Sequence, residues 1–345
     1  MVHFTTFMIS VILTLCSGVL ASPIMSEATT SNPIYDDSVG FDENYQGARR
    51  SLATASNPVY DESVGFDESY QGARRSLATR NEPILPTIMR WPEDQFGNDT
   101  AAVAKPFEPP VSAVKKLKRF IFGSGDNRQL WNVDIYPWHS VGRLQWESGV
   151  FCSGALVGPR HVLTARHCIP DKPISGNFAP GYDNGVRFGS GQVVAALTSI
   201  GQEKDTPCNT KADWAVLILD RALGNELGYF GVKTPDASKF DKPTFYHMGY
   251  PGDLESGSHP YRMLNVTVLS EKSLDCDPTG PLYTDTDTAG GQSGGPHWEY
   301  DQDGNRWIWG ALSIGVSWGK GLGYAGFASG AQMVDAINKL RKEYS

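Results

Sequence analysis

Residues 120–345 of this 345-residue chain are predicted to form an all-β fold. Three observations support this prediction. The apolar runs are short, glycines and other turn residues separate them, and only the C-terminal stretch clearly repeats its apolar residues at helical spacing. Many short strands separated by turns are typical of a β-sandwich or a β-barrel.

Five apolar segments are predicted to be strands bounded by turns. They are residues 154–157, 161–164, 215–219, 263–269 and 307–316. The last element is predicted to be an α-helix, because its apolar residues fall on one face and basic residues lie near its C-terminus, where the helix dipole favours cations. These apolar residues are Met333, Val334, Ile337 and Leu340.

The N-terminus is predicted to be a secretory signal peptide, residues 1–21. Residues 7–20 form an apolar run too short to span a bilayer, and small residues at Val19 and Ala21 suit signal peptidase. No later segment has enough uninterrupted apolar residues to cross a membrane. We therefore expect a secreted, extracellular and soluble protein with no membrane partner.

Residues 22–119 are predicted to be a largely disordered propeptide. Residues 31–54 and 56–79 repeat one another, and the two starting positions, 56 minus 31, give a period of 25 residues. Each copy is acidic and has few aliphatic residues, so a folded array of these repeats is not expected.

Basic clusters in this segment mark three expected cleavage sites for a processing convertase, after Arg50, Arg75 and Arg119. An extended, solvated chain can enter a protease cleft, although solvated charge in a disordered tail is the alternative interpretation. Cleavage at the first two sites would release the peptide Ser51–Arg75. Duplication without selection is the simpler explanation of the repeat.

Cysteine usage fits an oxidising compartment, because an even number of cysteines remains once Cys16 leaves with the signal peptide. The remaining cysteines are Cys152, Cys168, Cys208 and Cys276. None of them has the spacing of a zinc site, so no metal is expected. Asn98 and Asn265 begin glycosylation sequons. The formal net charge of −8 argues against a nucleic-acid partner.

Three polar residues beside apolar strands have the chemistry of nucleophilic catalysis. Ser293 lies in "TAGGQSGGPHW", His167 follows a strand in "LTARHCI", and Asp213 precedes one in "ADWAVLILD". A serine hydroxyl needs a base such as imidazole, and the imidazole needs a carboxylate that fixes its tautomer. Asp205 and Asp220 are nearby rivals for the carboxylate role.

The glycines around Ser293 have a function in this chemistry. A glycine-rich loop can turn the backbone N–H groups of Gly291 and Ser293 toward a developing oxyanion. A flexible linker is the alternative interpretation, but the run ends in Pro-His-Trp and strand-like segments flank it.

The segments "TARHC", "DWAVL" and "GGQSGGP", in this order, resemble the chymotrypsin-like serine peptidases over residues 120–345. The segments "FIFGSGDNRQLWNVDIYPW" and "DTDTAGGQSGGP" look most like the secreted glutamyl endopeptidase branch. The resemblance implies two six-stranded antiparallel β-barrels with a C-terminal α-helix and a catalytic triad in the cleft between the barrels. It also implies His167 as general base, Asp213 as its orienting carboxylate and Ser293 as nucleophile.

This resemblance implies peptide or protein substrates, and we expect no cofactor and a monomer. We expect Cys152 to pair with Cys168 behind His167, which leaves Cys208 to pair with Cys276.

The chain departs from the family pattern at three positions. Arg166 stands where a small residue usually precedes the catalytic histidine, and Ala289 replaces a cysteine found in trypsins. Gln292 replaces the aspartate that pairs with the new N-terminal amine when trypsin is activated. Because an amide cannot form that ion pair, the trypsin activation switch is expected to be absent.

The substrate-binding residues point to two opposite specificities. Asp287 lies where trypsins carry the aspartate that binds Lys or Arg, yet some glutamyl endopeptidases have Asp-Thr here, with the residue equivalent to Thr288 turned into the pocket. Further expected pocket residues are Ser317, Trp318, Gly319 and, through its freed α-amine, Phe120. We expect a preference for an acidic P1 residue. The alternatives are a Lys/Arg-specific peptidase and a catalytically inactive, protease-like binding protein.

Overall fold

The computed structural model describes residues 34–36, 83–109, 126–131, 134–199, 207–270, 276, 279–317 and 323–345. Several predicted features lie outside these residues, namely the signal peptide 1–21, nearly all of both repeats, the cleavage residues Arg50, Arg75 and Arg119, and the pocket residues Phe120, Trp318 and Gly319.

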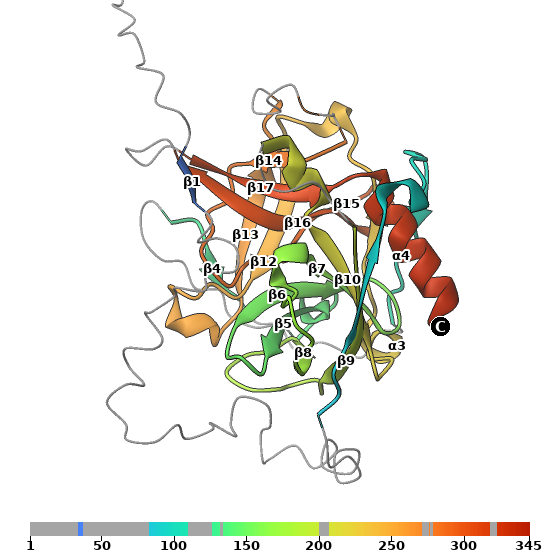
Figure 1. Cartoon of the computed structure of the whole chain (residues 1–345). Helices are drawn as coiled ribbons and strands as arrows, with labels where there is room; N and C mark the ends of the chain where they lie inside the picture. Colours follow the sequence, from blue (N-terminus) through green and yellow to red (C-terminus); the bar gives the residue numbers. More distant parts are fainter. Residues whose placement is uncertain are drawn as a thin grey trace, which may run out of the picture. The chain divides into compact units, whose positions relative to one another are not determined.

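The first barrel consists of six antiparallel strands (Figure 1). They are β5 (Val141–Trp146), β6 (Phe151–Leu156), β7 (His161–Ala165), β8 (Gly176–Pro180), β9 (Gly191–Ser199) and β10 (Trp214–Leu219). The strand order is β10-β7-β6-β5-β8-β9, and β10 also pairs with β9, which closes the barrel. Leu144, Leu156, Phe178 and Leu217 fill its interior. The strands predicted over 154–157, 161–164 and 215–219 are confirmed.

A second antiparallel sheet follows along the chain. Its six main strands are β12 (Pro243–Gly249), β13 (Tyr261–Thr267), β14 (Leu282–Thr284), β15 (Pro296–Tyr300), β16 (Arg306–Ser317) and β17 (Gly323–Ser329). They run in the order β14-β17-β16-β15-β12-β13, and a bridge between Val268 and Thr284 brings the two ends together. Phe245, Trp309 and Phe327 form part of its core.

Shorter elements complete this sheet. β4 (Gln129–Leu130) pairs with β13, and β11 (Gly231–Lys233) runs parallel to β16. The expected all-β, chymotrypsin-like architecture is therefore confirmed.

The C-terminal helix α4 (Ala331–Glu343) is confirmed, and all four apolar residues predicted for its inner face are buried. The other helical segments in the described parts of the chain are short. They are α3 (Gly224–Leu227) and the 3₁₀ turns Glu93–Gln95, Trp138–Ser140, Arg166–Cys168, Pro207–Ala212, Ala237–Lys239 and Glu255–Gly257. Within the described residues, no helix is long and apolar enough to span a membrane.

Part of the predicted propeptide is packed onto the two sheets. Residues 83–109 form β2 (Thr87–Trp91), which pairs in parallel with β9, and β3 (Val103–Ala104), which pairs with β11. In Figure 1 this blue-green segment runs past α4 and along β9. Phe96 is only 5% exposed. Expecting disorder here was wrong, because large apolar side chains of this segment, among them Trp91 and Phe96, pack against the hydrophobic core.

One segment of the first repeat is also described. β1 (Ile34–Asp36) pairs antiparallel with residues 315–317 at the end of β16. Because β17 pairs with the same stretch of β16, β1 must occupy the other edge of that strand.

Candidate active site

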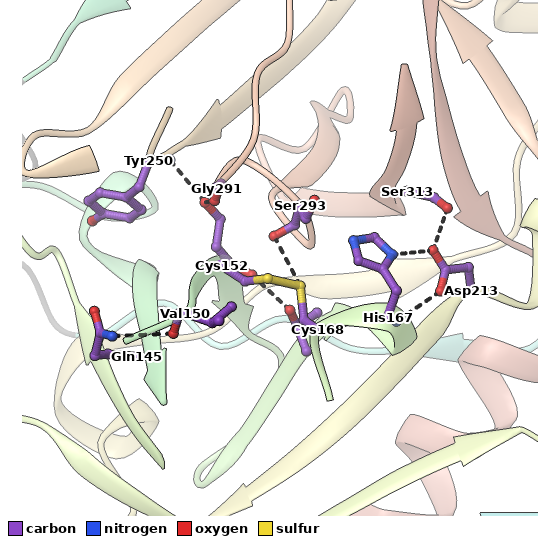
Figure 2. The surroundings of a disulfide bond; sticks show 12 residues. Gln145, Val150, Cys152, His167, Cys168, Asp213, Tyr250, Gly291, Ser293 and Ser313 are labelled. Carbon is purple, nitrogen blue, oxygen red and sulfur yellow. Dashed lines mark hydrogen bonds and ion pairs between the residues drawn. A yellow bond between two sulfur atoms is a disulfide. The ribbon is translucent and has the colours of Figure 1, made fainter. Parts of the chain in front are cut away.

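His167 lies in the 3₁₀ turn Arg166–Cys168, immediately after the fully buried strand β7. The predicted Cys152–Cys168 disulfide is confirmed and ties this turn to β6 (Figure 2). The Cys208–Cys276 disulfide is also confirmed. The strand end and the disulfide together fix the backbone position of His167.

Asp213 lies directly before β10 and is completely buried. Its Oδ1 accepts a hydrogen bond from the backbone N–H of His167 at 3.0 Å, and its Oδ2 lies 2.6 Å from His167 Nδ1. This contact makes Nδ1 the protonated nitrogen and leaves Nε2 as the acceptor. Nε2 is buried and has no hydrogen-bond partner among the described residues. The ring is therefore arranged to accept a proton at Nε2.

Two further side chains stabilise the buried carboxylate of Asp213. The hydroxyl of Ser313, on β16, donates to Oδ2, and Arg166 Nε lies 3.9 Å from Oδ1. The unusual Arg166 is thus accommodated because it faces a buried negative charge. Ser313 was missed by sequence reasoning, since a serine inside an apolar strand gives no signal of its distant partner.

The loop that carries Ser293 follows a path that requires glycine. Gly291 has a φ of +92°, and a Cβ there would approach Phe151 and the carbonyl oxygen of Tyr250 to 2.5 Å. The hydroxyl of Ser153 donates to Gly291 O at 2.8 Å, and its backbone N–H donates to Ser293 O at 2.8 Å. Ser153, on β6, therefore holds the loop through two hydrogen bonds. The sequence did not indicate this role.

Backbone hydrogen bonds also attach the loop to β16. Gly294 N donates to Leu312 O at 2.8 Å, and Leu312 N donates to Gly295 O at 2.9 Å. Ser313, the next residue, bonds Asp213. Figure 2 shows Ser293 on the side of the His167 ring away from Asp213. The structure thus brings all three predicted catalytic residues into one site.

Gln292 precedes the predicted nucleophile and is completely buried. Its Oε1 accepts hydrogen bonds from Arg128 Nη1 at 3.1 Å and from the backbone N–H of Ala289 at 2.9 Å. Its Nε2 lies 3.2 Å from His247 Nε2. Gln292 therefore has a cationic partner after all, supplied by a side chain rather than by a chain terminus.

Arg128 is held in place by two carboxylates. Its Nη2 lies 2.7 Å from Asp126 Oδ2 and 2.7 Å from Asp253 Oδ2, and the arginine side chain is only 7% exposed. Burial acts to lower the pKa of Arg128, but the hydrogen bonds to both carboxylates outweigh it and raise this pKa above its usual value. The guanidinium is consequently always charged.

The expected pocket residues are only partly described. Asp287 is half-buried, its Oδ2 accepts a hydrogen bond from the backbone N–H of Asn127 at 2.7 Å, and burial raises its pKa. Thr288 is half-buried beside it. Ser317 ends β16, four residues after Ser313. Trp318, Gly319 and Phe120 lie outside the described residues.

Two buried histidines lie behind the loop. Burial lowers the pKa of His247 to about 4 and that of His297 to about 3. The ring of His297 stacks on Phe245 with centroids 4.5 Å apart. Neither ring nitrogen of His297 has a hydrogen-bond partner within the described parts of the chain. His297 is thus a neutral core residue.

Comparison with known proteins places this site in a family. The Trypsin family model matches residues 132–339, which is more than half of the chain. A glutamyl endopeptidase of Bacillus licheniformis is 33% identical over 196 residues, covering 55% of this chain and 58% of that protein. An extracellular metalloprotease of Bacillus subtilis is 26% identical over 189 residues, covering 51% and 56%.

A solved Glu endopeptidase structure shares the fold, with a TM-score of 0.52 and 23% identity over 64% of this chain and 98% of that one. The matches span somewhat over half the length of both curated relatives. Since the family model covers both sheets and all three predicted catalytic residues, the chain belongs to the trypsin family.

Proposed function

We propose that this chain is a secreted serine endopeptidase. The observation that carries the proposal is the buried Asp213–His167 pair, with contacting atoms 2.6 Å apart and His167 Nε2 left as a proton acceptor. In the proposed reaction, Ser293 Oγ attacks the peptide carbonyl carbon while its proton passes to Nε2. The peptide C–N bond then breaks, and the amine leaves with that proton. Water repeats the sequence on the acyl-enzyme and restores Ser293.

We propose that the backbone N–H groups of Gly291 and Ser293 stabilise the oxyanion. Support comes from the positive φ of Gly291 and from the hydrogen bonds that hold the loop on both sides, to Ser153 and to Leu312. A preorganised loop does not need to rearrange as negative charge develops, which is the basis of its catalytic effect.

We propose an acidic P1 preference. One oxygen of the Asp287 carboxylate already accepts the N–H of Asn127, which makes this group less suited to bind a substrate Lys or Arg. The similarity to a glutamyl endopeptidase supports the same preference. A Lys/Arg-specific pocket built on Asp287 is the alternative.

We further propose export and proteolytic processing. Two disulfides suit an oxidising compartment, and both sequon residues, Asn98 and Asn265, are exposed, as glycosylation requires. Cleavage after Arg119 would free Phe120 as a new N-terminus. β1 pairs with residues 315–317 of β16, which come shortly after Ser313 in the same strand. This pairing supports a latent form in which the propeptide covers that edge of β16.

The test uses the processed, secreted protein and two variants, Ser293→Ala and His167→Ala. We expect a fluorophosphonate to label the wild-type protein at Ser293, and both variants to lose labelling and roughly 10⁶-fold of the hydrolysis rate. Equal labelling of His167→Ala would remove this residue from the base role. A wild-type protein that is folded, processed and unlabelled would support the inactive binding protein instead.

Specificity is measured on the same preparation with a diverse peptide library. Sequencing of the cleavage products is expected to show Glu or Asp at P1. Cleavage after Lys or Arg would replace this proposal with the trypsin-like alternative, without affecting the proposed triad.

A further inference from the structure

Residues 83–109, which we call the strap, are built into both sheets although they precede the proposed cleavage site after Arg119. We propose that the strap stays bound after that cleavage and forms the light chain of a two-chain processed protein. This inference rests on the proposed processing, and the surface that would hold the strap consists of β9, β11 and α4 of the same chain.

Strand pairing gives the strap its first attachment. β2 pairs in parallel with Ala195–Ser199 of β9, over five residue pairs from Thr87 to Trp91. β3 pairs antiparallel with Val232 and Lys233 of β11. Loss of the strap would leave one edge of each partner strand without its backbone hydrogen bonds, which is costly where that edge is covered from water.

Burial of apolar side chains gives the second attachment. Phe96 is 5% exposed and Ala104 is fully buried. The Phe96 ring lies edge-on to Trp214 with centroids 5.3 Å apart, and within the strap the ring of Trp91 stacks on Phe96 with centroids 5.9 Å apart. Trp214 directly follows Asp213, so the strap supports the start of the strand that positions the catalytic carboxylate. Its removal would open a cavity at that point.

Polar contacts to the C-terminal helix give the third attachment. The backbone N–H of Gly97 donates to Asp335 Oδ2 at 2.8 Å. Arg341 Nη1 donates to the carbonyl oxygen of Lys105 at 2.7 Å, and Asn338 Nδ2 donates to that of Val103 at 3.2 Å. These contacts join the strap to the opposite end of the sequence, so cutting one connecting segment does not release it.

The link after cleavage would be non-covalent. Residues 83–109 contain no cysteine, and both disulfides join residues between 152 and 276. The two chains are therefore expected to remain together in native buffer and to separate in denaturant without any reducing agent. This behaviour distinguishes the proposed light chain from a disulfide-linked one.

The experiment measures the mass of the processed protein under native and denaturing conditions, for the wild type and for Ser293→Ala. We expect a fragment that ends at Arg119 and contains the strap to be present at one copy per catalytic chain in native buffer, in both proteins. Non-reducing denaturation is expected to separate them. A native species that lacks the strap and keeps full labelling by the fluorophosphonate would overturn the proposal, as would a strap that is never cut from the catalytic chain.

Two variants test the contacts themselves. Phe96→Ala is expected to weaken strap retention after cleavage by roughly 100-fold or more, because a buried phenylalanine is replaced by a cavity. The matched control is Leu85→Ala, since Leu85 lies on the same strap but is 60% exposed. Equal retention of the two variants would contradict the proposed contact. If Phe96→Ala fails to fold, the wild-type protein is titrated with urea instead. Release of the strap is then expected at the same urea concentration as the loss of fluorophosphonate labelling, and release at a lower concentration with labelling intact would contradict the proposed contact. The retention readout does not depend on hydrolysis, so its failure leaves the proposed activity standing.

Discussion

Replacing Arg128 by Gln tests whether a side-chain cation positions the loop of the predicted nucleophile. Arg128 Nη1 donates to the buried Oε1 of Gln292 at 3.1 Å, and Gln292 lies between the two residues proposed to stabilise the oxyanion. The substitution keeps much of the side chain but removes the charge and shortens its reach. We expect the loop to sample positions in which the N–H groups of Gly291 and Ser293 diverge.

The magnitude follows from the contacts that are lost and kept. A hydrogen bond to a charged group contributes about 1.5–3 kcal/mol. Gln292 Oε1 keeps the N–H of Ala289 at 2.9 Å, and Asp126 and Asp253 are each 47% exposed, so water partly replaces their lost partner. The lower end, about 1.5 kcal/mol, therefore applies and corresponds to a roughly tenfold fall in kcat. KM is expected to change less than about twofold, because the loop acts on the transition state.

The assay is steady-state hydrolysis of a peptide with the preferred P1 residue, together with the melting temperature of each variant. Arg128→Lys keeps the charge but loses the forked geometry, so it is expected to recover part of kcat. Arg90→Gln is the matched control, since Arg90 is exposed on β2. An Arg128→Gln protein with unchanged kcat would refute the positioning role, and a fall in kcat that only mirrors the unfolded fraction would reduce Arg128 to a structural residue.

Three other predictions concern stability and the triad. Burial lowers the pKa of His247 to about 4 and that of His297 to about 3, below the unfolded value of about 6.5, so the unfolded chain binds more protons and stability falls as the pH drops from about 6.5 toward 4. Each such histidine contributes about 1.4 kcal/mol per pH unit below its unfolded pKa, and His161, whose pKa burial lowers to about 4, adds to the same slope. His297→Phe should therefore reduce the slope by about 1.4 kcal/mol per pH unit in urea titrations at pH 7, 6 and 5, and an unchanged slope would contradict the assignment. Ser313→Ala removes a hydrogen bond to the buried Asp213 carboxylate and should lower kcat about tenfold; stopped-flow acylation at the wild-type rate would exclude this role. Replacing Cys208 and Cys276 by serine removes a disulfide that spans 68 residues and should lower the free energy of unfolding in guanidinium by about 4 kcal/mol. Replacing Cys152 and Cys168, which span 16 residues, should lower it by about 3 kcal/mol. Equal losses would argue against the entropic model.

Local patterns in the sequence determined much of this protein. Strands β6, β7 and β10 could be predicted from their apolar runs, because a strand that is buried on both faces needs consecutive apolar residues whichever strands it pairs with. Helix α4 is recognisable from the spacing of its inner face. Ser293, His167 and Asp213 could be predicted as a triad because each lies in a short motif beside a strand, where immediate neighbours set the local backbone geometry.

The tertiary structure alone decided the partners of these residues. Arg128 and Gln292 are 164 positions apart, and Ser313 and Asp213 are 100 positions apart, so nothing local links them. Their meeting depends on strand register, and a shift of one residue would turn each side chain to the opposite face. The disorder expected of the strap was wrong for the same reason: Phe96 resembles an isolated aromatic residue in a propeptide until Trp214, more than a hundred residues later, is placed against it. A contact contributes free energy only after the chain between its two partners has been ordered, and that ordering is a property of the whole fold.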